Sequence, residues 1–128
     1  MRTTVPRNDG TDRCRLGLAA ELRAGRFLER RGLKVLARNF SCRAGELDLV
    51  CIEGPILVIV EVRRRSSRAF GGALASVTAA KRRRIRIAAA VYLGARPGLG
   101  RMPVRFDVIG IDAPRGAPGE LVWIRDAF

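Results

Sequence analysis

Apolar residues recur at helical spacing in two segments of the chain. The first runs from about residue 13 to 31, and Gly32 is suited to end it as a C-terminal cap. The second runs from about 79 to 93 and follows Thr78, a residue type favoured at helix N-caps. The expected apolar stripe of the first helix consists of Leu18, Leu22, Phe27 and Leu28, with Ala19, Ala20 and Ala24 between them. The expected buried face of the second consists of Ile85, Ala88, Ala89, Tyr92 and Leu93.

Shorter segments show the apolar runs or the two-residue alternation of β-strands. They cover residues 33–40, 45–52, 56–62, 104–111 and 121–124. Residues 53–55 (Glu-Gly-Pro) separate the second strand from the third and suit a tight hairpin turn, because glycine tolerates positive φ and proline avoids central strands. The predicted order is α-β-β-β-α-β-β in a single α/β domain at 13–128, after a polar, disordered tail at 1–12.

The predicted hairpin carries carboxylates where a core is expected. One face of its first strand holds Leu47, Leu49 and Cys51, and the other holds Glu46, Asp48 and Val50. Glu61 alone interrupts the apolar run of the second strand. Because adjacent antiparallel strands pair side by side, we expect Asp48 and Glu61 to lie close together. Glu21 lies beside the apolar stripe of the first helix, where a position on the solvated surface is one interpretation and a functional role is the other.

Two interpretations of the buried acids remain open. A carboxylate buried without a partner costs several kcal/mol, and two side by side would repel unless a cation lay between them. Mg²⁺ with oxygen ligands would resolve this, since it takes one or two carboxylates, waters and phosphate oxygens. Structural salt bridges from Asp48 and Glu61 to nearby arginines are the alternative.

The charge of the chain predicts an anionic partner. The formal net charge is +13 and the sequence pI about 11.6, which in a compact domain points to nucleic acid. Only Lys34 and Lys81 are lysine, so the arginine-rich composition also reflects a high-GC genome. Two basic segments stand out, the loop at 63–72 and the start of the second helix at 81–86, where cations are disfavoured by the helix dipole. Each suits either a phosphate contact or a solvated surface.

Composition also excludes several classes of protein. No apolar run approaches the roughly 20 residues of a membrane span, and the N-terminal segment lacks an apolar signal core. Cys14, Cys42 and Cys51, with no histidine in the chain, have no zinc-like spacing and leave an odd thiol. We therefore expect a cytoplasmic protein without a membrane partner.

Asp107 is expected to pair with Arg105 or to cap a loop, and Trp123 to anchor the core or the sheet edge.

Several motifs together resemble the YraN-like family of uncharacterised bacterial proteins. They are GELDLV, VEVRRRSS, FGGALASVTAAKRRRIRIAAAVYL, RFDVI and WIRDAF, in the right order from about residue 16 to the C-terminus. That family is similar in its core to the restriction-endonuclease-like nucleases of the PD-(D/E)XK class and to archaeal Holliday-junction resolvases. The resemblance implies an α-β-β-β-α-β core with a mixed central sheet flanked by helices.

The resemblance also implies roles for individual residues. Asp48 matches the first metal-binding aspartate, Glu61 the acid of the E-x-K element, and Glu21 the acid on the first helix of resolvase-like members. The proline of the PD element is absent, since Leu47 precedes Asp48. Glu46 is a spare oxygen ligand or a supporting acid.

Arg63 stands where the nuclease pattern has lysine. Arginine cannot act as a base, although it can hold a phosphate or stabilise developing negative charge. The exchange is compatible with drift at a tolerant position and with lost activity. Lys81, a lysine kept among arginines, is expected to contact phosphate.

The sequence thus predicts an endonuclease acting on structured or branched DNA. Its site would comprise Asp48, Glu61 and Glu21, which would bind Mg²⁺ or else Mn²⁺, and Arg63 at the scissile phosphate. The DNA backbone would be contacted by Arg64, Arg65, Arg68, Lys81 and Arg82. A homodimer is expected from the resolvase resemblance alone. The alternatives are a nucleic-acid-binding protein without catalysis and an adaptor for an acidic protein.

Overall fold

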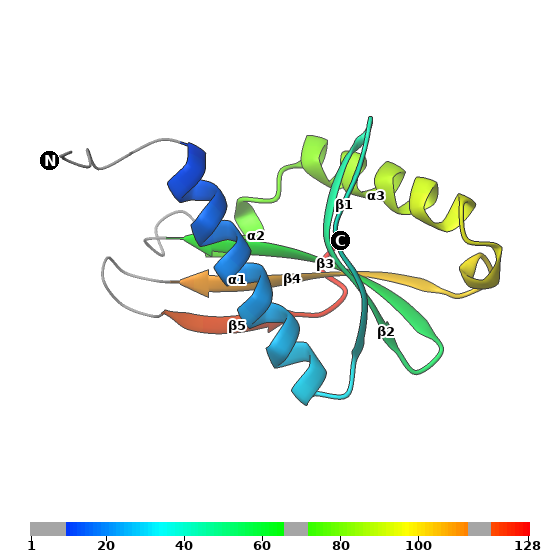
Figure 1. The fold of residues 1–128 in the computed structure, drawn as a ribbon, viewed down its shortest axis with the longest axis horizontal. Helices are drawn as coiled ribbons and strands as arrows, with labels where there is room; N and C mark the ends of the chain where they lie inside the picture. The colour runs from blue at the N-terminus through cyan, green and yellow to red at the C-terminus, as the bar shows by residue number, and fades with distance from the viewer. Residues whose placement is uncertain (1–9, 66–71, 113–118) are drawn as a thin grey trace, which may run out of the picture.

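A computed structural model describes residues 10–65, 72–112 and 119–128 (Figure 1). Its elements are α1 (Gly10–Arg30), β1 (Lys34–Cys42), β2 (Gly45–Glu53), β3 (Ile56–Arg65), α2 (Gly72–Ala75), α3 (Ala79–Gly94), the 3₁₀ turn η2 (Pro97–Leu99), β4 (Val104–Asp112) and β5 (Glu120–Ile124). The predicted order is confirmed, with α2 and η2 as additions. Helix α1 begins at Gly10, inside the stretch expected as a tail, and residues 1–9 of that stretch lie outside the described residues.

The five strands form one mixed sheet in the order β1-β2-β3-β4-β5. Strands β3 and β4 are parallel, and the other neighbouring pairs are antiparallel. A parallel pair needs a long crossover, which α2 and α3 provide here. The turn between β2 and β3 is the predicted one, with Glu53 opposite Ile56 and Gly54 at a φ of 57°. The predicted mixed α/β fold is therefore confirmed.

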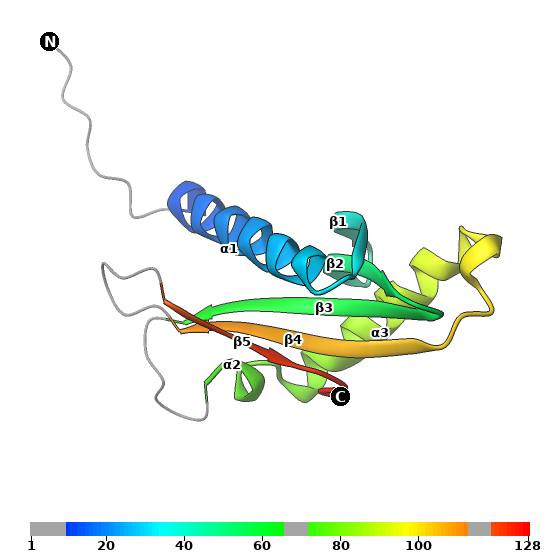
Figure 2. The ribbon, with the colours of Figure 1, turned by 90° about the horizontal axis from the view of Figure 1, so that it is seen from below.

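Helices cover both faces of the sheet, with α1 on one side and α2 and α3 on the other (Figure 2). The core on the α1 side includes Ala20, Ala24 and Leu28 of the helix against Leu49, Cys51, Val58, Val60 and Ile109 of the strands. The core on the α3 side includes Ile85, Ala88, Ala89 and Tyr92 against Leu47, Val50, Leu57, Ile59 and Val108. The sheet is thus buried on both faces, as expected of a parallel pair at its centre.

The stripe predicted for α1 was partly wrong. Leu18 and Leu22 are 51% and 47% exposed, whereas the predicted Ala20, Ala24 and Leu28, spaced four residues apart, are buried as expected. Small residues allow the helix axis to approach the sheet closely, so the face that carries alanine is buried and the neighbouring leucines lie outside it. Helix α3 follows the prediction, because the Thr78 side chain accepts a hydrogen bond from the Lys81 backbone N–H at 3.2 Å.

The predicted alternation along β2 was also wrong at one point. Leu49 and Cys51 pack on the α1 side, but Leu47 packs on the α3 side with Val50. A regular strand would place Leu47 and Leu49 on the same face. The strand therefore departs from regular geometry next to Asp48, and Figure 1 shows β1 and β2 crossing the direction of β3 and β4 steeply.

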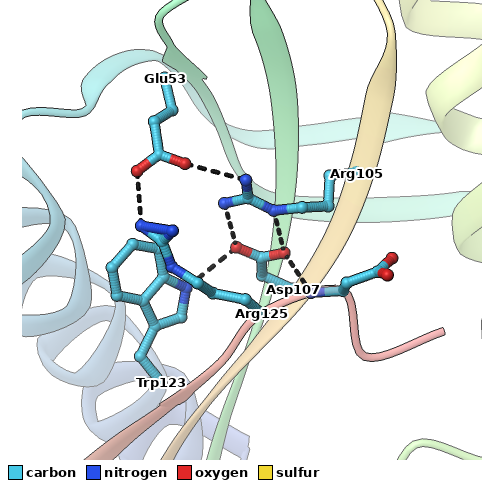
Figure 3. A network of polar contacts seen from close by, with 6 residues as sticks. Glu53, Arg105, Asp107, Trp123 and Arg125 are labelled. Atoms are coloured by element: carbon cyan, nitrogen blue, oxygen red, sulfur yellow. Dashed lines mark hydrogen bonds and ion pairs between the residues drawn. The ribbon is translucent and has the colours of Figure 1, made fainter.

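A buried polar network ties β4 to β5 and the C-terminal segment (Figure 3). Asp107 has no exposed surface, and its two carboxylate oxygens accept hydrogen bonds from both Nε and Nη2 of Arg105, from Trp123 Nε1 and from the Asp126 backbone N–H, each at 2.9 Å. Arg105 also reaches Glu53 at 2.8 Å. The pairing of Asp107 with Arg105 and the anchoring role of Trp123 are confirmed. Among the described residues, no helix is both long and apolar enough to cross a membrane.

Candidate functional site

The sheet opens on both sides of Asp48. Within the described residues, β2 pairs with β3 from Glu53↔Ile56 to Leu49↔Val60, one position short of Asp48 and Glu61. On the other side, the β1–β2 ladder keeps its register from Arg38↔Leu49 to Phe40↔Leu47 but has no pair between Asn39 and Asp48, and Asn39 has a φ of 54°. The Asp48 carboxylate takes part in the interrupted ladder, because its Oδ2 accepts the Val62 backbone N–H at 2.8 Å.

Three carboxylates from different elements meet at this opening. Asp48 of β2 is hydrogen-bonded to Glu61 of β3, and Glu21 of α1 is hydrogen-bonded to Asp48 and to Asn39. Glu61 is only 3% exposed, and Glu21 Oε1 is buried without a hydrogen-bond partner. The predicted closeness of Asp48 and Glu61 is confirmed, and the structure brings Glu21 to the same point.

Burial dominates the electrostatics of these acids. It raises the pKa of Glu61 to about 7, and the neighbouring charge of Asp48 adds to this while Lys81 opposes it. Burial also raises the pKa of Asp48, against the hydrogen bonds from Glu61 and from the Val62 N–H. The pKa of Glu21 is raised by burial too, against its hydrogen bonds to Asn39 and Asp48. Keeping all three carboxylates ionised therefore costs free energy, and a cation or a proton shared between two of them lowers that cost.

Two cations already approach Glu61. Lys81 Nζ of α3 lies 2.9 Å from Glu61 Oε2, and Arg63 Nη1 lies 3.6 Å from the same oxygen. Arg63 is oriented by Ser76, since its Nε donates to Ser76 Oγ at 2.9 Å and that hydroxyl donates to the Ala73 carbonyl at 2.5 Å. The salt-bridge interpretation thus holds for Glu61. Asp48 differs, because its carboxylate accepts a hydrogen bond from the Val62 backbone N–H of β3.

A cavity of about 160 Å³ opens onto the acids and is lined by Gly45, Glu46, Asp48, Glu61, Lys81, Arg84 and Ile85. Arg84 was not singled out from the sequence. The available signal was helical spacing, because Arg84 follows Lys81 by one turn of α3 and so lies on the same helix face. Asn39 and Ser76 were also missed, since their roles depend on contacts between elements.

The other predicted basic contacts have different positions. Arg64 follows Arg63 near the end of β3 and is exposed, whereas the side chain of Arg65 and all of Arg68 lie outside the described residues. Arg82 is partly buried beside the C-terminal segment. Its Nε donates to the Val77 carbonyl at 2.9 Å and its guanidinium carbon lies 5.3 Å from the Phe128 ring centroid. Arg82 is therefore not among the cavity-lining side chains.

The donor set suits a hard divalent cation, although it is not preformed. Among the described residues, no group of three or more Asp, Glu, His or Cys side chains has the spacing of a metal site. The oxygens nevertheless include a buried Glu21 Oε1 without a hydrogen-bond partner, beside hydrogen-bonded Asp48 and Glu61. Carboxylate oxygens are the ligands that Mg²⁺ and Mn²⁺ prefer. These residues fit such an ion if Lys81 moves off Glu61.

Comparisons with known proteins place the chain among close relatives. The model of the uncharacterised protein family UPF0102 matches residues 20–111. A UPF0102 protein of Xanthomonas axonopodis pv. citri is 51% identical over 112 residues, covering 88% of this chain and 89% of the relative. One of Pseudomonas putida is 43% identical over 114 residues, covering 89% and 93%. One of Halorhodospira halophila is 45% identical over all 128 residues and 96% of its own length.

Proposed function

The chain belongs to the uncharacterised protein family UPF0102, the YraN-like family that its motifs indicated, and we propose that it is a metal-dependent endonuclease acting on structured or branched DNA. The observation that carries the proposal is the meeting of Asp48, Glu61 and Lys81 at one cavity, with Glu21 hydrogen-bonded to Asp48 beside it. Four elements contribute these side chains, namely strands β2 and β3 and the helices α1 and α3 on opposite faces of the sheet. A purely structural ion pair would need only two of them.

The proposal includes metal binding by these acids, in place of simple charge pairing. Asp48 and Glu61 would hold Mg²⁺ or Mn²⁺, and Glu21 would assist through its unpartnered Oε1. When bound, such an ion polarises phosphate oxygens and lowers the pKa of a coordinated water. Burying three carboxylates together costs free energy. The chain nevertheless has all three at one place, although its net charge is +13.

The two cations of the site have separate roles. Lys81 reaches the cavity from α3 and would hold a non-bridging phosphate oxygen, where its charge offsets the negative charge that develops during attack. Arg63 is held by Ser76 within 3.6 Å of Glu61 Oε2 and would contact the scissile phosphate. Because arginine stays protonated, Arg63 binds and orients and does not act as a base. Lys81 thus supplies the amine that position 63 lacks.

DNA binding would rest on charge more than on base sequence. Arg84 lies in the cavity and Arg64 is exposed near the end of β3, so both can contact phosphates on either side of the scissile one. Arg65, Arg68 and Arg82 are the other proposed backbone contacts. Phosphate contacts of this kind give an affinity that falls steeply with salt. A DNA substrate implies a cytoplasmic protein, and a two-stranded junction cut implies a homodimer.

A nucleic-acid-binding protein without catalysis is the second candidate. The observation that favours it is the double pairing of Glu61 with Lys81 and Arg63, which leaves its Oε2 already satisfied. In that case the acids would fix α1 and α3 against the opened sheet, and DNA would bind to the arginines alone. The unpartnered Glu21 Oε1 speaks against it, because a structural cluster gains nothing from an unsatisfied buried oxygen.

The test is a calorimetric titration of Mg²⁺ and of Mn²⁺ into the wild-type protein and into the Asp48→Asn/Glu61→Gln double variant. Both forms are then incubated with a labelled four-way DNA junction, with and without metal. We expect the wild type to bind metal and to cleave the junction, and the variant to do neither while still binding DNA. Metal binding that is equal in the two proteins, or junction binding without cleavage at any metal concentration, would exclude the endonuclease and favour the binding protein.

A further inference from the structure

A second cavity adjoins the acid cluster on its α1 side. Its volume is about 250 Å³, and its walls are Gly17, Leu18 and Glu21 of α1, Asn39 of β1 and Glu46 of β2. Glu46 also lines the first cavity, so the two spaces share a wall at β2. If one phosphate of a polynucleotide strand lies in the first cavity, the neighbouring nucleotide of that strand can therefore reach the second cavity.

The lining of the second cavity differs in chemistry from that of the first. The first contains Lys81 and Arg84, whereas the described walls of the second contain no lysine or arginine. Its carboxylates, Glu21 and Glu46, disfavour a phosphate group. They accept hydrogen bonds, the Asn39 amide donates and accepts, and Leu18 provides an apolar surface that is 51% exposed. Such walls suit an uncharged, flat group that carries N–H donors.

The backbone of Asn39 is held in an unusual conformation at this wall. Its φ of 54° lies in the left-handed region, and it interrupts the β1–β2 ladder opposite Asp48. A left-handed residue that is not glycine costs about 1 kcal/mol or more, and such strain collects at functional sites. The Asn39 side chain is hydrogen-bonded to Glu21, which links the second cavity directly to the acid cluster.

We propose that the second cavity binds one unpaired nucleobase of the strand whose phosphate lies at Lys81 and Arg84. A water occupies about 30 Å³ in the liquid, so the cavity has room for roughly eight, which is comparable with one heterocyclic ring system. Leu18 would cover the face of the ring, while Asn39 and Glu46 would bind the N–H groups of its pairing edge. A base within a duplex has that edge occupied and its faces stacked, so it cannot enter.

This inference rests on the proposed function and defines its substrate further. The preferred DNA has an unpaired nucleotide directly beside the phosphate that is held, as at a bulge, a flap or a branch point. Fully paired DNA would still bind through phosphate contacts, with lower affinity. Because Leu18 is aliphatic, we expect the weaker end of what stacking on an aromatic side chain contributes, a change of about tenfold in affinity.

The test measures binding in the presence of a chelator, so that neither metal nor cleavage is needed. The probes are a duplex with a single bulged 2-aminopurine and the same duplex fully paired. The proteins are the wild type, Leu18→Ala, Asn39→Gly and, as the matched control, Ile87→Ala. Ile87 is a similar side chain on α3, 53% exposed and not a wall of either cavity. Glycine at position 39 retains the positive φ without strain, so Asn39→Gly should fold.

We expect the wild type and Ile87→Ala to bind the bulged duplex about tenfold more tightly than the paired one, with a change in 2-aminopurine fluorescence. Leu18→Ala and Asn39→Gly should lose most of this preference and keep their affinity for paired DNA. Equal affinity of the wild type for both probes, or a preference that survives both variants, would overturn the proposal. A bulge preference without metal-dependent cleavage would support the base cavity and refute the nuclease. Cleavage without a bulge preference would do the reverse.

Discussion

Lys81 Nζ lies 2.9 Å from Glu61 Oε2. Glu61 belongs to strand β3, and Lys81 belongs to helix α3, which covers the sheet. This contact brings the one lysine of the site to the acid of the E-x-R element, where Arg63 occupies the position expected for lysine. The amine and the guanidinium thus share one carboxylate oxygen. Under the proposed function, a metal ion at that oxygen would take the place of the amine and leave it available to a phosphate.

Replacing Lys81 tests the role of its amine. Lys81→Met should lower metal-dependent cleavage of a DNA junction by about 10²- to 10³-fold, the usual effect of removing one preorganised donor at a developing charge. DNA affinity should fall much less, because the arginines remain. Lys34→Met is the control, since Lys34 is the chain's other lysine and is exposed at the start of β1. Equal cleavage by Lys81→Met and Lys34→Met would assign Lys81 a purely structural pairing.

The raised pKa of Glu61 predicts a pH-dependent stability. Its carboxyl group has a pKa of about 7 in the folded protein against an ordinary value of 4.5. The folded state therefore binds the proton more tightly than the unfolded state, so stability is highest below about pH 4.5 and is lost as the pH rises through about 7. The loss reaches at most about 3 kcal/mol.

Urea unfolding of the metal-free protein at pH 5 and at pH 8 measures this loss. The Glu61→Gln variant cannot ionise at this position, so the free energy of unfolding of the wild type, relative to the variant, should be lower at pH 8 than at pH 5. Carboxyl groups away from the cluster titrate in both proteins and cancel in the comparison, so the difference reports Glu61 together with Asp48, which is hydrogen-bonded to it. A difference that is the same at both pH values would show that Glu61 titrates normally.

The sequence was sufficient for the order of elements and for the main acid pair. The periodicity of residues 79–93 and Thr78 defined α3, and the Gly54-Pro55 turn fixed the register that leads to Asp48 and Glu61. These features are local, because each depends on residues that are near in sequence. Local patterns of this kind are the most reliable basis for predicting secondary structure from a sequence.

The contacts between elements were not predictable in the same way. Leu18 and Leu22 were expected in the core because they are large and apolar, but close packing of α1 on the sheet selected Ala20 and Ala24. The left-handed Asn39 was also not predicted, because its conformation depends on the opening of the sheet beside Asp48. Both outcomes depend on tertiary packing, which overrides local preference.

The Asp107 network predicts a large effect on stability away from the site. Asp107→Asn places an amide N–H₂ among four donors and leaves the Arg105 guanidinium, whose side chain is 15% exposed, without its full counter-charge. Breaking one partner of such a buried pair costs about 3–5 kcal/mol. Glu53→Gln, at a side chain 26% exposed, should cost less than about 1 kcal/mol. Similar losses in urea unfolding of the two variants would contradict this.

We predict that Gly110 affects the position of Arg63 from the neighbouring strand. A Cβ at Gly110 would lie 2.5 Å from Ala73 Cβ, so Gly110→Ala must push α2 away from β4. Because Ser76 Oγ bonds both the Ala73 carbonyl and Arg63 Nε, the same shift should release the Arg63 guanidinium. Overpacking of this kind costs about 1–3 kcal/mol, and we expect weaker binding of DNA in addition.

The compensating change separates this mechanism from a general loss of stability. Ala73→Gly removes the atom that clashes, so Gly110→Ala/Ala73→Gly should recover most of the free energy of unfolding and the DNA affinity lost by Gly110→Ala. Ala73→Gly alone should lower stability by about 1 kcal/mol, because glycine weakens the short helix α2. Urea unfolding and fluorescence-anisotropy binding of DNA give both quantities for the four proteins. If the double variant were no better than Gly110→Ala alone, steric contact with Ala73 would not be what positions α2 and, through Ser76, Arg63.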